Sequence, residues 1–87
     1  MEIIYTLNYT KKAIKDIQNL KAAKLADKVA DLCKSLEENP MPLHSKELFG
    51  DLKGKRSIRI NLQHRLVYEI FEGEKMVKIL SMWNHYE

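Results

Sequence analysis

The last third of the chain alternates apolar and polar residues in three short segments that tight turns separate. In the first segment, alternation places Ile58 and Ile60 on one face of a strand and Arg59 on the other. Residues 65–71 and 76–82 show the same period of two, and a short glycine-containing turn joins them. Connections this short exclude crossovers, so the three strands are predicted to form an antiparallel meander.

The first part of the chain predicts a strand followed by a helix. Residues 2–6 are β-branched and aromatic, which favours a short strand. Asn8 is predicted to cap the helix that follows, and Asp16 falls on its polar side together with several lysines. The apolar residues of this helix recur at helical spacing and are Ala13, Ile14, Ile17 and Leu20.

A longer helical stripe follows in residues 25–36, and Pro40 and Pro42 end it because proline cannot continue a helix. Cys33, the only cysteine, lies on this stripe, which predicts a core residue rather than a reactive thiol and excludes an internal disulfide. The two helices are expected to form a hairpin whose apolar face the sheet covers. The predicted fold is α+β, with the order β-α-α-β-β-β, a helical hairpin packed on a small antiparallel sheet, in a single domain over residues 1–87.

The charge balance favours an anionic partner without identifying it. The chain has 15 Lys+Arg against 12 Asp+Glu, which gives a net charge of +3. Nucleic acid is the first candidate for such a surplus, and an acidic protein segment is the second. The sequence shows neither a secretory signal nor a membrane span, so a cytoplasmic protein with no membrane partner is expected.

Arg59 and Arg65 have matching parity on either side of a predicted hairpin turn, so both can point to one face of the sheet. Arginine binds phosphate through a planar fork of donors, although two solvated strand residues would give the same pattern. His64 precedes Arg65 at the start of a strand, where a structural role is the better interpretation.

Two further residues complete a set suited to RNA cleavage. His85 can exchange a proton near neutral pH, and Glu47 can act as a base if burial favours its protonated form. Taken singly, a solvated tail histidine and a surface loop carboxylate are the better interpretations of these two residues. Together with the arginine pair they fit metal-free cleavage, in which a base activates the 2′-hydroxyl, cations stabilise the phosphoryl oxygens and an acid protonates the leaving 5′-oxygen. The histidines and the cysteine show no ligand spacing, so no metal or other cofactor is expected.

The chain resembles the RelE/YoeB (Txe) family, the toxins of bacterial toxin–antitoxin pairs, over nearly its whole length. The ending His85-Tyr86 is typical of the YoeB branch. The other segments that carry the resemblance are Leu52-Lys53-Gly54, Arg59-Ile60 and His64-Arg65-Leu66-Val67-Tyr68.

The resemblance implies a RelE-like fold and a ribosome-dependent mRNA endonuclease, or mRNA interferase, that inhibits translation and is held inactive by a co-expressed antitoxin. By position, Arg65 matches the arginine that holds the scissile phosphate, and Arg59 matches a supporting one. His85 matches the general acid, Tyr86 a tyrosine that contacts the substrate, and Glu47 the general base. The implied partners are the antitoxin, mRNA on the ribosome and ribosomal RNA.

The segment around Glu47 departs from the family pattern. The YoeB pattern has Glu-Pro-Leu before the Leu-x-Gly turn, whereas this chain has Lys46-Glu47-Leu48, displaced by one position and without the proline. Phe49 stands where a lysine is expected, but Lys46 and Lys53 are close to this position in sequence. Lys46, Lys53 and His64 are therefore further candidates for contacting the substrate.

The lysines of the helical hairpin have three interpretations: a solvated face, a docking surface for ribosomal RNA, or the surface that an acidic antitoxin covers. These lysines are Lys11, Lys12, Lys15, Lys21, Lys24 and Lys28.

Two alternative functions also stay open, namely a ParE-like inhibitor of DNA gyrase and a catalytically inactive homologue that still binds an antitoxin.

Overall fold

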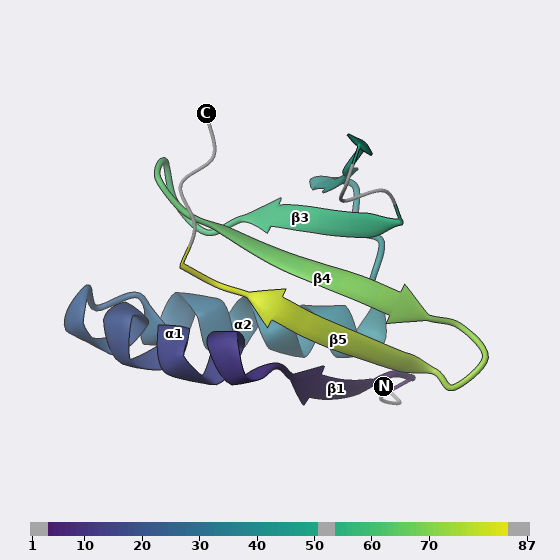
Figure 1. Ribbon diagram of the computed structural model, residues 1–87, viewed down its shortest axis with the longest axis horizontal. Coiled ribbons are helices and arrows are strands. Elements are labelled where there is room, and N and C mark those ends of the chain that lie inside the picture. The colour runs from purple at the N-terminus through teal and green to yellow at the C-terminus, as the bar shows by residue number, and fades with distance from the viewer. Residues whose placement is uncertain (1–3, 51–53, 84–87) are drawn as a thin grey trace.

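The computed structural model describes residues 4–50 and 54–83, which form an α+β fold. Two helices lie against one face of a mixed sheet, on the side of β1 and β5 (Figure 1). Among the described residues the sheet has five strands, in the order β1-β5-β4-β3-β2. The elements are β1 (Thr6–Tyr9), α1 (Lys11–Ala22), α2 (Ala26–Glu38), β2 (Ser45–Glu47), β3 (Lys55–Arg59), β4 (Arg65–Phe71) and β5 (Met76–Ser81).

The predicted helical hairpin and the antiparallel meander β3-β4-β5 are confirmed. The sheet as a whole is mixed rather than antiparallel, because β1 pairs in parallel with β5, the outer strand of the meander. The chain between these two strands contains both helices and strands β2 to β4, so it is long enough for the crossover that a parallel pairing requires. A short strand that the sequence did not predict, β2, pairs antiparallel with β3 and forms the other edge.

The first strand begins later than predicted. The backbone N–H groups of Ile4 and Tyr5 both donate to the carbonyl of Glu37 at the end of α2, over 3.1 and 3.0 Å, so they tie the chain to the helix instead of joining the sheet. Asn8 consequently lies inside β1 and does not cap α1. Thr10 is the N-cap, because its hydroxyl accepts a hydrogen bond from the Ala13 N–H over 3.1 Å.

The buried face of α1 differs from the predicted one. Ala13 and Leu20 are buried as expected, but Ile14 is 56% exposed and Asp16 is only 5% exposed. Residues 13, 16 and 20 are separated by three and four positions, so they share one side of a helix. The helix turns this side, rather than the side of Ile14, towards the end of β5.

The second helix agrees with the prediction from the sequence. Val29, Cys33 and Leu36 are buried, and the helix ends at Glu38, because the backbone of Asn39 is extended before Pro40. The Tyr68 hydroxyl, fully buried under the sheet, donates to the Pro40 carbonyl over 2.6 Å and anchors the segment that leaves α2. Neither helix of the described part of the chain is long and apolar enough to cross a membrane.

The core lies between the helices and one face of the sheet, here called the helix face. Fully buried side chains of β3, β4 and β5 and of the residue after β3 meet the buried stripes of both helices. Burying a side chain of this size stabilises a fold by about 1.5–3 kcal/mol, so this layer is the main source of stability. The sheet residues concerned are Ile58, Ile60, Leu66, Tyr68, Val77 and Ile79.

Candidate functional site

Arg59 and Arg65 are direct partners across β3 and β4, at the last pair of the ladder. Directly opposite residues of an antiparallel pair point to the same face. Ile58 and Leu66, the adjacent pair, point to the helix face, so both arginines lie on the opposite face of the sheet. The predicted parity of the two arginines is confirmed.

The hairpin turn that places the arginines opposite one another is held by local hydrogen bonds. The side-chain oxygen of Asn61 accepts from the N–H groups of Gln63 and His64, over 2.9 and 2.8 Å. The His64 carbonyl accepts from the Ile60 N–H over 2.9 Å and closes the turn. An asparagine in this position mimics a backbone turn, so the sequence itself sets the register of β3 and β4.

The surroundings of the two arginines differ. Arg59 is exposed, whereas Arg65 is half-buried and its Nη1 donates to the Ser57 hydroxyl over 3.3 Å. Ser57 and Val67, which pair with each other on the same face, are themselves buried. Arg65 is therefore held against the sheet by Ser57, whereas Arg59 is exposed to solvent.

The one-residue displacement around Glu47 has a structural consequence. Lys46 pairs with Ser57 and so lies on the face of the arginines, whereas Glu47 pairs with Arg56 and lies on the helix face. Side chains alternate along a strand, so a shift of one residue moves a group to the other side of a sheet. The structure therefore does not bring Glu47 together with Arg59 and Arg65.

Glu47 belongs to a different surface. It is exposed and lines a small cavity of about 270 Å³ with Arg56 and Glu72. Arg56 also lies on the helix face, where the Ser45 hydroxyl accepts hydrogen bonds from its Nε and Nη2 over 3.2 and 2.9 Å. We call the opposite face, with Lys46, Ser57, Arg59 and Arg65, the arginine face.

His64 has a structural position, as the sequence favoured. It is only 2% exposed, and its ring stacks on Trp83 with 3.8 Å between the centroids and 18° between the planes. His85, Tyr86 and Lys53 lie outside the described residues, so their roles stay predictions. Across residues 4–50 and 54–83, no group of His, Cys, Asp and Glu side chains is placed to hold a metal ion.

Sequence reasoning missed Asp16, which was assigned to the polar side of its helix. The structure buries its carboxylate against the end of β5, where it accepts from the backbone N–H groups of Met82 and Trp83 over 2.9 and 3.2 Å. Its spacing from Ala13 and Leu20 is the signal that would have found it.

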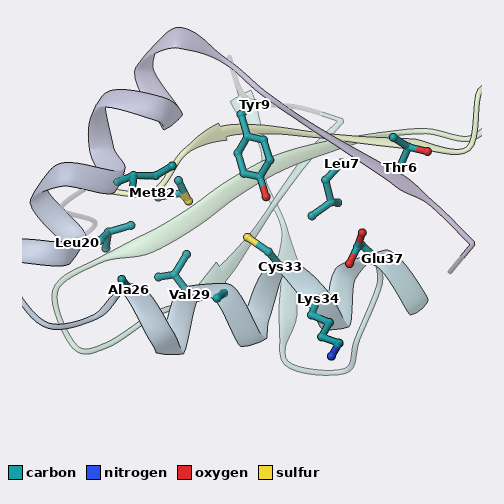
Figure 2. Close-up of a pocket in the computed structure, with 12 residues that line it drawn as sticks. Thr6, Leu7, Tyr9, Leu20, Ala26, Val29, Cys33, Lys34, Glu37 and Met82 are labelled. Carbon is teal, nitrogen blue, oxygen red and sulfur yellow. The ribbon is translucent and has the colours of Figure 1, made fainter. Parts of the chain in front are cut away.

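An apolar groove of about 580 Å³ opens on the other side of the molecule, between β1 and the two helices. In Figure 2 the Tyr9 ring reaches across it towards Cys33, and the Tyr9 hydroxyl donates a hydrogen bond to the Cys33 sulfur. Burial, together with Cys33 and Glu37, raises the pKa of Tyr9 to about 12. Further lining residues are Leu7, Ile17, Val29, Ala30 and Lys34.

Comparison with known proteins gives the family. The family model described as the ParE toxin of the type II toxin–antitoxin system, parDE, matches residues 7–87. This chain belongs to the ParE family of toxins. No curated protein matches the chain significantly.

Solved structures of related toxins have the same fold. A YoeB/ParE toxin from Agrobacterium tumefaciens superposes with a TM-score of 0.83 at 26% identity, over 93% of this toxin and 99% of that chain. A chain of the YoeB–YefM complex from Staphylococcus aureus gives 0.78 at 29%, over 94% and 98%. A chain of the toxin–antitoxin complex RelBE2 from Mycobacterium tuberculosis gives 0.76 at 30%, over 97% and 100%. The toxin is therefore similar to YoeB and RelE toxins as well as to ParE.

Cys33 should react slowly with thiol reagents. Burial raises the pKa of its thiol, against the hydrogen bond from Tyr9, which lowers it, so less thiolate is present at pH 8 than in a free cysteine. We expect alkylation by iodoacetamide at pH 8 to be at least about tenfold slower than for glutathione. The same chain unfolded in urea is the control and should react at the ordinary rate. A folded protein that reacts as fast as the unfolded one would contradict the buried position.

Proposed function

We propose that this toxin is an endoribonuclease that cleaves mRNA on the ribosome, with its site on the arginine face. The observation that supports the proposal most is the direct pairing of Arg59 with Arg65 on the face away from the helices. Two arginines in this arrangement repel each other in the absence of an anion, and an RNA phosphate between them would relieve the repulsion.

The chemistry assigned to this face needs no metal. The 2′-oxygen attacks the adjacent phosphorus, the bond to the 5′-oxygen breaks, and a 2′,3′-cyclic phosphate forms. Arg65 and Arg59 would stabilise the negative charge that develops on the phosphoryl oxygens. His85 would give a proton to the leaving 5′-oxygen, and Tyr86 would contact the neighbouring nucleotide.

The group that removes the proton from the 2′-hydroxyl has to lie on the arginine face. Glu47 lies on the opposite face, so we assign this role to Lys46, which pairs with the buried Ser57 between the arginines and the sheet edge. A lysine amine in its neutral form can accept a proton, and in its charged form it adds to the phosphate-binding charge. Lys53 would add a further cation from the neighbouring loop.

Replacing Arg65 by alanine should lower cleavage about 10²–10³-fold, because one preorganised donor to the developing charge is lost. Arg59→Ala should have a smaller effect, since Arg59 is exposed. Cut sites on a reporter mRNA are measured by primer extension in a translating extract, with and without ribosomes. Arg56→Ala is the matched control, because Arg56 lies on β3, the strand of Arg59, but on the helix face. Undiminished cleavage by Arg65→Ala would overturn the proposal.

Lys46 and Glu47 are adjacent residues on opposite faces of the sheet, so variants of the two show which face carries the cleavage site. Lys46→Ala should lower cleavage at least about tenfold, whereas Glu47→Gln should leave it unchanged. Lys46→Arg keeps the positive charge but cannot lose a proton at accessible pH, so it distinguishes a base from a simple cation. Activity retained in Lys46→Arg would assign a purely electrostatic role. A loss in Glu47→Gln equal to that in Lys46→Ala would contradict the placement.

A second candidate function is inhibition of DNA gyrase, which the ParE family model favours. The same purified protein answers this question in a gyrase supercoiling assay. Inhibition of supercoiling together with intact mRNA would replace the nuclease proposal by this one. If neither activity is present, the result favours the third alternative, an inactive homologue that retains antitoxin binding.

We further propose that an acidic antitoxin segment occupies the apolar groove between β1 and the helices. The groove is lined mainly by apolar side chains, and one cation, Lys34, and one carboxylate, Glu37, lie on its wall. Solved structures of related toxins include complexes with antitoxins, namely YoeB–YefM from Staphylococcus aureus and RelBE2 from Mycobacterium tuberculosis. An amphipathic segment with acidic flanks matches both the apolar lining and the net charge of +3.

Filling the groove should block the antitoxin without affecting cleavage. Ala30 is exposed and lines the groove, so Ala30→Trp should weaken binding of the protein encoded beside the toxin gene by more than about tenfold. Ala22→Trp is the matched control, because Ala22 is an exposed helical alanine that does not line the groove. Binding is measured by calorimetry on purified proteins. Equal affinities for both variants would place the antitoxin elsewhere.

A further inference from the structure

Asp16 is the buried carboxylate of α1, and its hydrogen bonds reach the point where the chain leaves the sheet. Its Oδ2 accepts from the N–H of Met82 over 2.9 Å and from the N–H of Trp83 over 3.2 Å. These are the first two backbone donors after β5 ends at Ser81. A buried carboxylate is costly unless it is fully hydrogen-bonded, so this one stabilises a particular path of the chain.

The outer side of the same carboxylate is held by Lys12, one helical turn earlier. The Lys12 ammonium lies 3.0 Å from Oδ2 and 3.2 Å from Oδ1, and it is half-exposed while Asp16 is buried. The first turn of the helix adds a further bond, because the Thr10 hydroxyl donates to the Leu80 carbonyl over 2.7 Å. Thr10 and Asp16 therefore both connect the start of α1 to residues 80–83.

The Trp83 side chain makes a second contact, with His64. Its ring stacks on the buried ring of His64, with centroids 3.8 Å apart. His64 lies in the hydrogen-bonded turn that Asn61 closes, and Arg65 is the next residue. The backbone of Trp83 is therefore held by Asp16 of α1, and its ring is held by His64, the residue before β4.

We propose that Asp16 is a positioning residue for the cleavage site, because it holds Trp83, which precedes His85 by two residues. The inference rests on the proposed function. Two residues of chain span at most about 7 Å, so His85 stays within that distance of Trp83, and we expect a displacement of Trp83 to change the position of the general acid. Asp16 itself contacts neither the RNA nor the reacting atoms. A misplacement of about 1 Å can cost a catalytic group up to about a hundredfold in rate.

The first arm of the test reports on position alone and needs no RNA. Trp83 is the only tryptophan, so its fluorescence and its quenching by acrylamide report directly on this contact. Asp16→Ala should increase quenching, whereas Asp16→Asn, whose side-chain oxygen can still accept both N–H groups, should give an intermediate value. Asp31→Ala, at an exposed aspartate of α2, is the matched control, and Lys12→Met should leave the backbone bonds intact. Unchanged quenching in Asp16→Ala would overturn the inference.

The second arm asks whether the general acid has been displaced. The mRNA substrate is compared with one that carries a 5′-bridging phosphorothiolate at the cut site, whose sulfur leaves without needing a proton. We expect Asp16→Ala to lose about ten- to a hundredfold on the ordinary message and to recover on the sulfur-containing one, and we expect the same of His85→Ala. Arg65→Ala should not recover, because its loss concerns the phosphoryl oxygens.

The remaining outcomes separate the two proposals. Equal losses for Asp16→Ala on both substrates would mean a general loss of structure and would overturn the positioning role. Asp16→Asn guards against misfolding, because it keeps the shape of the side chain and should recover in the same way as Asp16→Ala. If wild-type protein cleaves neither substrate, the proposed function fails and the catalytic role of Asp16 fails with it. The quenching arm still decides whether Asp16 holds Trp83.

Discussion

The pairing register of β3 with its two neighbours is the constraint on which the candidate site depends. On one side it places Arg59 opposite Arg65, and on the other it places Lys46 opposite Ser57. Side chains alternate along each strand, so a slip of one residue in either pairing would send these cations to the helix face and their neighbours outwards. The core prevents such a slip, because Ile58 and Leu66 form the adjacent pair and both are fully buried.

The arginine pair places two like charges directly opposite each other across β3 and β4. Taken by itself, such a pairing is destabilising by a few tenths of a kcal/mol up to about 1 kcal/mol. Local rules of this kind are broken mostly at functional sites, where a ligand of opposite charge completes the arrangement. Arg56 on the helix face differs from this pair, because it donates two hydrogen bonds to the Ser45 hydroxyl and has a structural role.

Two polar contacts connect the helical layer to the sheet at positions where apolar packing alone would leave the direction of the chain open. The Tyr68 hydroxyl holds the Pro40 carbonyl after α2, and the Asp16 carboxylate holds Met82 and Trp83 after β5. Hydrophobic burial is non-directional, whereas a buried hydrogen bond fixes both a distance and an angle. The core therefore provides most of the stability, and these contacts determine where the segments beside the site begin.

Much of this protein follows from the sequence, because the relevant signals are local. The period of two in 57–82, the helical stripe of 25–36 and the break at Pro40 depend only on neighbouring residues, and they predicted the meander, the second helix and the shared face of Arg59 and Arg65. The family resemblance likewise rests on short segments. Local patterns were therefore sufficient to predict that the two arginines share a face.

The tertiary structure decided what depends on contacts between distant parts of the chain. The parallel pairing of β1 with β5 joins strands from opposite ends of the chain, so neither strand alone predicts it. The burial of Asp16 depends on N–H groups 66 and 67 residues away. The side of the sheet on which Glu47 lies follows from its pairing with Arg56, which local patterns did not reveal because β2 is only three residues long. Alternation along one strand shows which residues share a face, but only its partner shows which face that is.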